Sequence, residues 1–214
     1  HCAVERIGFP LKLNRWISGR IMESSVDSYC ACSSSAAEAK YTKVVLPQVH
    51  YLKNGINLTK FKYSADVRRL VRSKLDIQDN VMILGQVGRL SYQKNQSFSL
   101  RVFNEIHKID QNTKLWFIGQ GEDHDQLERL SEKLGISNCV TFFGAVPDTS
   151  PYYQAMDGFI FPSKYEGAPI SLIEAETSGI PCATSTNIFS ARKDGSFFKH
   201  LSLDEIHAPS LLHI

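Results

Sequence analysis

The sequence predicts an α/β protein in which a parallel β-sheet is flanked by helices. From residue 81, short apolar runs alternate with segments whose apolar residues recur at helical spacing. Glycines close several of these apolar runs. Apolar residues make up 43% of the chain and charged residues 21%, as in an ordinary globular protein. Strands that alternate with helices in this way are typical of parallel sheets joined by crossover helices.

The elements before residue 60 are less regular. Residues 15–26 and 34–42 have helical character, whereas residues 27–33 and 44–52 favour extended structure. The sequence Lys-Asn-Gly-Ile-Asn at 53–57 is a turn signal and the best candidate for a domain boundary.

Residues 60–75 predict one helix with a basic face. Such a face is usually only solvated, and contact with the anionic inner face of a membrane is the less favoured alternative. Its cations are Lys60, Lys62, Arg68, Arg69, Arg72 and Lys74.

The alternating region then predicts strands at 81–89, 114–118, 139–144, 158–163 and 180–185. Helices are expected at 95–109, 122–135, 151–156 and 169–179. The helix at 122–135 has an acidic first turn and ends at Gly135, as the helix dipole and C-cap geometry favour.

Charge and cysteine content exclude several classes of protein. Lys plus Arg number 24 and Asp plus Glu 22, so no overall field indicates nucleic-acid binding. The five cysteines lack the C-x-x-C spacing of a zinc site, and their odd number favours a reducing, cytoplasmic compartment. No apolar run approaches the roughly 20 residues of a membrane-spanning helix, and no signal peptide is evident. Because the chain begins with His1, we expect it to start inside a longer protein.

Three loops between a predicted strand and the next helix carry candidate ligand-binding residues. The first, at 88–95, presents Arg89 and Lys94, which together could neutralise a diphosphate. The alternative is an exposed loop with two ordinary cations. The second, at 118–122, contains Gly119 and Gly121, part of a dinucleotide fingerprint that equally fits a tight turn.

The third such loop, within 165–181, places two glutamates around a helix start. Pro169 lies near the first helical position, so the backbone of Gly167 and Ala168 can face a phosphate or a sugar hydroxyl. Glu166 stands before the helix and Glu174 about one turn inside it. A carboxylate accepts two hydrogen bonds, as vicinal sugar hydroxyls require, although a surface Glu and a structural Glu would give the same pattern.

These segments together resemble one known family. The blocks NGINLTKF, VGRLSYQKN, LWFIGQGE, VTFFG and MDGFIFPSKYEGAPISLIEAETSGIP are similar to the C-terminal half of the family-4 retaining glycosyltransferases. The resemblance runs from about residue 25 to 187 and is greatest to bacterial members that build capsules and exopolysaccharides. It implies the Rossmann-like, donor-binding half of a GT-B fold.

The resemblance also implies roles for individual residues and the reaction. Arg89 and Lys94 would bind the diphosphate of a nucleotide sugar and act in catalysis together with Glu166, which would contact the donor sugar. Glu174 would hold the ribose hydroxyls and the stretch around Val146 the base. Gly119, Gly121, Gly167, Ala168 and Pro169 would complete the donor site. UDP is the default nucleotide, the acceptor a glycan or lipid-linked sugar, and no cofactor or metal is required.

On this resemblance the chain divides into three parts. Residues 1–53 would be the remnant of an acceptor-side domain, 54–190 the nucleotide-sugar-binding domain, and 191–214 a truncated or divergent tail. No histidine lies in a block that matches the family's histidine near the reacting sugar, so none is assigned to catalysis. Because most of the acceptor-side domain would lie before residue 1, the isolated chain is expected to be incomplete and inactive. The alternatives are a non-catalytic nucleotide-sugar-binding fragment and a dinucleotide-binding oxidoreductase domain.

Overall fold

The computed structural model describes residues 20–21, 23–185 and 198–201. The chain divides into two compact units, residues 1–55 with 165–170 and residues 56–164 with 171–214. Half of the helix predicted at 15–26 lies outside the described residues; of its described half, residues 20–21 and 23–24 are helical. The tail expected at 191–214 is described only at 198–201, where it forms a strand.

Two short parallel strands and helix α2 (Ser34–Lys40) pack together in the described part of the first unit. Strand β1 (Tyr29–Ala31) pairs with β2 (Val49–Tyr51), and α2 follows β1. The Ser33 hydroxyl accepts a hydrogen bond from the Ala36 backbone N–H and so caps α2. The strand expected at 44–52 is shorter than predicted, because the segment around Pro47 forms the 3₁₀ helix η1 (Leu46–Gln48) instead.

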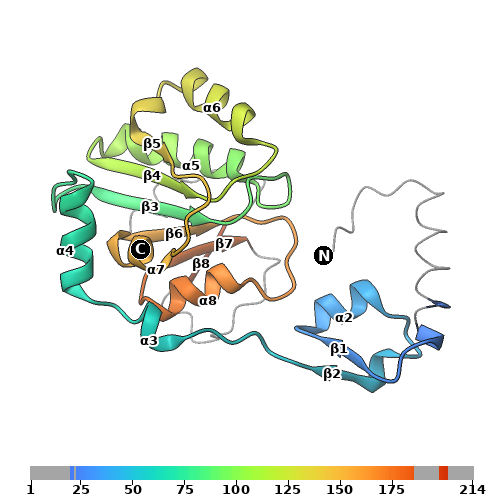
Figure 1. Cartoon of the computed structure of the whole chain (residues 1–214). Coiled ribbons are helices and arrows are strands. Elements are labelled where there is room, and N and C mark those ends of the chain that lie inside the picture. The colour runs from blue at the N-terminus through green and yellow to red at the C-terminus, as the bar shows by residue number, and fades with distance from the viewer. Residues whose placement is uncertain (1–19, 22, 186–197, 202–214) are drawn as a thin grey trace. The chain divides into compact units, whose positions relative to one another are not determined.

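The second unit is built on a parallel sheet of six strands (Figure 1). Its strands are β3 (Met82–Val87), β4 (Thr113–Ile118), β5 (Val140–Phe142), β6 (Gly158–Phe161), β7 (Cys182–Ser185) and β8 (Phe198–Leu201). Their spatial order is β5-β4-β3-β6-β7-β8. The chain thus proceeds outward from β3 to β5 and then restarts on the other side of β3 with β6. The order reverses between β3 and β6, and the predicted α/β fold class is confirmed.

Helices cover both faces of this sheet. Helices α5 (Gln96–Ile109) and α6 (His124–Lys133) contribute to the apolar core on one face. Helices α3 (Leu58–Phe61), α4 (Ala65–Lys74), α7 (Ser150–Ala155) and α8 (Ile170–Thr177) contribute to the other. The 3₁₀ helix η2 (Ser137–Cys139) leads into β5. Strand β4 shows the alternation, because Leu115 and Phe117 pack in the first core and Trp116 and Ile118 in the second.

The single basic helix expected at 60–75 is wrong. The chain breaks between α3 and α4, where Ser64 caps α4 by accepting a hydrogen bond from the Val67 N–H. Arg72 is 1% exposed and donates to the Ala155 and Gln78 carbonyls at 3.0 and 2.7 Å. Arg68 and Arg72 both pair with Asp157. These two cations are therefore structural, since they satisfy carbonyls and a carboxylate that packing would otherwise leave unpaired.

Across the described part of the chain, no helix has both the length and the apolar character needed to cross a membrane.

Candidate functional site

The reversal of strand order marks the edge of the sheet where a ligand is expected. In open parallel sheets, ligands bind beyond the carboxyl ends of the strands at such a point. The loops that follow β3 and β6 contact each other there. Lys94 Nζ lies 4.8 Å from the centre of the Phe161 ring, the Asn95 side chain donates to the Pro162 carbonyl at 3.2 Å, and Lys164 N–H donates to the Gln93 carbonyl at 2.9 Å.

Arg89 is the exposed cation of this loop. Its Nε lies 3.0 Å from Glu122 Oε2, and the two side chains are 69% and 56% exposed. The pKa of the Glu122 carboxyl is lowered by a hydrogen bond from the Glu122 backbone N–H, and the charge of Arg89 lowers it further. Ion pairs this exposed contribute little to stability. Arg89 can therefore exchange Glu122 for an anionic ligand at small cost.

Gly119 and Gly121 let the loop after β4 pack closely against the loop after β3. A Cβ atom at Gly119 would lie 2.1 Å from the Gly88 carbonyl oxygen, and one at Gly121 would lie 2.1 Å from that of Leu90. The Leu90 N–H also donates to the Gln120 carbonyl. The two glycines thus have a packing role close to Arg89, which explains the G-x-G pattern without a dinucleotide. Their contact with a donor stays a prediction.

Glu174 lies half-buried on α8, and Tyr153 fixes its carboxylate. The single proton of the Tyr153 hydroxyl is shared between two acceptors, Glu174 Oε2 at 2.9 Å and the Ser171 carbonyl at 3.0 Å. Burial raises the pKa of Glu174, the Tyr153 hydrogen bond and Lys60 oppose this rise, and Asp148 adds to it. Burial, and then the charge of Glu174, raise the pKa of Tyr153 well above its usual range. The phenol therefore keeps its proton and acts as a donor.

A pair of charged residues stands near Glu174. Lys60 Nζ on α3 lies 3.0 Å from Asp148 Oδ1, in the loop before α7. Burial raises the pKa of Asp148, but hydrogen bonds from Ser150 and Lys60 lower it overall. Val146, in the same loop, packs against the apolar core. The structure therefore brings Lys60 and Asp148, which lie far from Glu174 in the sequence, into its neighbourhood. The contact of Val146 with a base stays a prediction.

The residues from Glu166 to Pro169 belong to the first unit. The Ala168 carbonyl accepts a hydrogen bond from the Asn54 side chain at 2.7 Å. A Cβ atom at Gly167 would lie 3.3 Å from Cys32 Sγ, so this glycine also allows close packing. Pro169 immediately precedes α8, which begins at Ile170. Glu166 is half-buried, and its predicted contact with a sugar remains a prediction.

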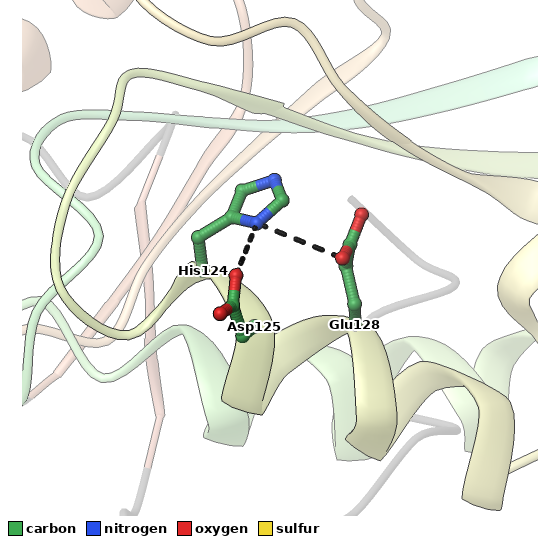
Figure 2. Close-up of side chains that lie close together, drawn as sticks. All are labelled: His124, Asp125 and Glu128. Atoms are coloured by element: carbon green, nitrogen blue, oxygen red, sulfur yellow. Dashed lines mark hydrogen bonds and ion pairs between the residues drawn. The ribbon is translucent and has the colours of Figure 1, made fainter.

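Among the described residues, one group could offer three ligands to a metal ion (Figure 2). His124, Asp125 and Glu128 lie on the first turns of α6, with His124 Nδ1 at 3.3 Å from Asp125 Oδ1 and 3.7 Å from Glu128 Oε2. Two carboxylates facing one imidazole nitrogen equally describe a surface ion pair. The carboxylates are well exposed and sit on one helix, and we assign them no ligand.

Sequence reasoning missed three residues that shape these contacts. Tyr153 orients Glu174 from 21 positions away, Glu122 pairs with Arg89 from 33 positions away, and Lys60 reaches Asp148 across the fold. Each is an ordinary residue within a helix or a loop, and no local pattern separates it from its neighbours. The packing of α7 on α8, of α3 beside α7, and of one loop on the next brings them to the site.

Comparison with known proteins identifies the family. The family model described as "Glycosyl transferases group 1" matches residues 67–193, more than half of the chain. The chain belongs to the group 1 glycosyltransferases. This confirms the family that the sequence motifs indicated, and it decides against the dinucleotide-binding oxidoreductase alternative.

Individual relatives agree with this assignment. EpsF of Bacillus subtilis (strain 168), named as a glycosyltransferase, is 26% identical over 179 residues, which cover 83% of this chain and 47% of EpsF. The alpha-monoglucosyldiacylglycerol synthase of Streptococcus pneumoniae (strain ATCC BAA-255 / R6) is 32% identical over 155 residues, or 70% of this chain and 34% of that protein. The chain thus spans at most about half the length of these glycosyltransferases.

The fold agrees as well. The crystal structure of HepE from Anabaena, in complex with UDP and glucose, superposes with a TM-score of 0.78 over 94% of this chain and 56% of HepE. The two sequences are 17% identical over this match, so the similarity establishes the fold alone. The second unit has the Rossmann-like architecture of GT-B glycosyltransferases, as predicted.

Proposed function

We propose that this chain is the nucleotide-sugar-binding part of a retaining glycosyltransferase, which transfers a sugar from a UDP-sugar in polysaccharide biosynthesis. The observation that carries the proposal is the cationic loop after β3. Lys94 of this loop lies against Phe161 at the end of β6, where the strand order reverses, and Arg89 precedes it by five residues. Two cations at this edge of the sheet suit a diphosphate.

In this proposal Arg89 forks onto the diphosphate oxygens and Lys94 supplies a point charge. When the bond between the anomeric carbon and the diphosphate oxygen breaks, negative charge develops on the leaving group. The two cations stabilise that charge because they are held in place before the reaction. The acceptor hydroxyl oxygen forms the new bond on the same face of the sugar, and its proton passes to the departing phosphate. This scheme requires no metal ion.

The remaining predicted residues divide the donor between them. Glu174 accepts hydrogen bonds from the two ribose hydroxyls, and Glu166 contacts the transferred sugar. The backbone of residues 167–169 contacts sugar and phosphate, and the stretch around Val146 lies beside the base. Glu174 is the best supported of these, because Tyr153 holds its carboxylate in one orientation while it stays half-buried. A fixed carboxylate suits vicinal hydroxyls.

UDP, the acceptor and the compartment belong to the same proposal. UDP is favoured because HepE, with the same fold, has been crystallised with UDP and glucose. A glycan or a lipid-linked acceptor is favoured because the pneumococcal relative is named for a glucosylated diacylglycerol. A cytoplasmic location fits the four described cysteines, which are all free thiols. Peripheral contact with the inner membrane face is the remaining part of the proposal.

Nucleotide binding is tested by calorimetry with UDP and with uridine. We expect UDP to bind at least about tenfold more tightly than uridine, since each charge-assisted contact contributes about 1.5–3 kcal/mol. Arg89→Ala and Lys94→Ala should each remove about tenfold of this preference. Arg129→Ala, which removes an exposed cation from α6, is the matched control and should leave the preference unchanged. Equal affinity for UDP and uridine would refute the role of the loop.

Transfer activity separates the enzyme from the non-catalytic alternative. Sugar transfer requires donor and acceptor in near-attack contact within a water-poor site, which in two-domain glycosyltransferases lies between the domains. We therefore expect the 214-residue chain to bind donor without transferring sugar, and a protein that adds an acceptor-side domain to transfer it. In that protein Glu166→Ala should lower turnover more than nucleotide affinity. A radiolabelled-sugar assay that detects transfer by the short chain would contradict this expectation.

A further inference from the structure

Two buried glutamines hydrogen-bond to the backbone of Arg89 and Lys94, the residues that carry the two cations of the loop after β3. Gln86 lies in β3 and Gln96 is the first residue of α5, and each is 1% exposed. The Gln96 Nε2 donates to the carbonyl of Arg89 at 2.9 Å. The Gln86 Nε2 donates to the carbonyl of Lys94 at 2.8 Å. Each cation-bearing residue is therefore held at its own carbonyl by a buried amide.

The acceptor ends of both amides are also occupied. Gln86 Oε1 accepts a hydrogen bond from the Ser99 hydroxyl at 2.7 Å, and Ser99 is fully buried. Gln96 Oε1 accepts from the Ser91 backbone N–H at 3.3 Å. With a donor fixed at each Oε1, the NH₂ group of each amide must face the loop carbonyl. The hydrogen-bond pattern thus sets the direction in which each glutamine acts.

The location of these amides is the second part of the argument. A buried amide costs free energy unless it is hydrogen-bonded, and an apolar side chain would fill the same space more cheaply. Here both amides are used on one short loop that contains no regular structure. Both amides hydrogen-bond to the backbone of the loop, and Gly121 packs closely against the same loop at Leu90. A loop braced in this way keeps its cations in place before a ligand arrives.

We propose that Gln86 and Gln96 are positioning residues that preorganise Arg89 and Lys94 for a diphosphate. This inference rests on the proposed function. It adds that two residues outside the ligand contacts, Gln86 and Gln96, set the affinity for the diphosphate. Neither glutamine touches the ligand. Their removal should therefore reduce the contribution of the phosphates to binding and leave the contribution of the nucleoside unchanged.

The test compares UDP with uridine in Gln86→Met and Gln96→Met, which keep the length of the side chain but remove the amide. We expect the preference for UDP over uridine to fall about tenfold, the factor that one charge-assisted contact contributes, with uridine affinity within about twofold of the parent. Ser99→Ala provides a milder variant that removes only the group orienting Gln86. It should give a smaller loss of the same kind, and it remains informative if the glutamine variants fold poorly.

The matched control is Gln154→Met. Gln154 is also a buried glutamine, 5% exposed, and its Oε1 accepts a hydrogen bond from the Ser64 N–H at 3.0 Å, away from the loop after β3. A purely structural role for buried glutamines predicts that all three variants lower thermal stability and none changes the preference for UDP. An unchanged preference in folded Gln86→Met, Gln96→Met and Ser99→Ala would overturn the inference while the proposed function stands. A parent chain that does not prefer UDP to uridine would overturn both.

Discussion

Tyr153→Phe tests the role of Glu174 with the smallest change that the structure allows. The substitution keeps the ring, which packs against Phe61 and Phe159, and removes only the hydroxyl that donates to Glu174 Oε2 at 2.9 Å. Without ligand, water can replace that donor because Glu174 is half-buried. With a ribose bound, water is excluded and the carboxylate lacks one hydrogen bond. The loss therefore falls mainly on the complex.

The size of this loss follows from the kind of hydrogen bond removed. A hydrogen bond to a charged group contributes about 1.5–3 kcal/mol, and the partial exposure of Glu174 favours the lower end. About 1.5 kcal/mol corresponds to roughly tenfold weaker UDP binding. The pKa of Glu174, already raised by burial, should rise further once the Tyr153 hydroxyl no longer opposes that rise. The acid limb of UDP binding should accordingly move to higher pH, with Lys60 and Asp148 left as the charged groups that influence Glu174.

Calorimetry with UDP and 2′-deoxy-UDP provides the readout. In the parent, loss of the 2′-hydroxyl should weaken binding about tenfold, and in Tyr153→Phe this discrimination should shrink to roughly threefold or less. Tyr152→Phe is the control, because it removes the same hydroxyl from a neighbouring ring that packs on Trp116 and Phe143. If Tyr153→Phe retains both the parent affinity and the parent discrimination, Glu174 does not bind the ribose in the orientation that Tyr153 sets.

Three further predictions concern stability. Asp157→Ala should lower the free energy of unfolding in urea by about 3 kcal/mol, because it leaves the buried guanidinium of Arg72 without its carboxylate; a loss below about 1 kcal/mol would contradict this. Because the folded-state pKa of Glu174 is raised above the ordinary value of 4.5, its ionisation costs stability as pH rises from that value through the raised pKa. Glu174→Gln should then compare more favourably with the parent at about pH 7 than at about pH 4, and the opposite trend in denaturant unfolding would reject the shift. Gly121→Ala should lower the free energy of unfolding by about 1–3 kcal/mol, because its Cβ atom would collide with the Leu90 carbonyl. Gly55→Ala, whose Cβ atom would meet open space, should leave that free energy unchanged, and equal effects of the two variants would disprove the packing role.

Much of the second unit could be predicted because its signals are local. The helix at 95–109 and the strand at 114–118 follow from periodicity and agree closely with α5 and β4. The end of α6 follows from Gly135, which has a φ of 74° in the region that glycine tolerates best. Such features need only a few neighbouring residues, so a single sequence contains them.

The remainder depends on contacts between distant residues. Arg68 and Arg72 have the spacing of a solvated helix face, yet they turn toward Asp157, more than 80 positions away. Nothing in the sequence distinguishes Gln86 and Gln96 from other polar residues, because their hydrogen bonds to the Lys94 and Arg89 carbonyls form only in the folded chain. Strand order also depends on distant contacts. The alternation of strands and helices predicts a parallel sheet, but it does not show that the strand order reverses between β3 and β6. The candidate site could therefore be predicted as a set of residues, but the groups that orient those residues could not.

The most direct test of donor binding is a crystal structure of the chain with UDP. We predict that the diphosphate oxygens lie within hydrogen-bond distance of the Arg89 guanidinium and the Lys94 ammonium. The ribose hydroxyls should lie on the Glu174 carboxylate, with the Tyr153 hydroxyl still donating to its other side. A nucleotide whose diphosphate lies away from the loop after β3, or whose ribose does not contact Glu174, would contradict the proposed site.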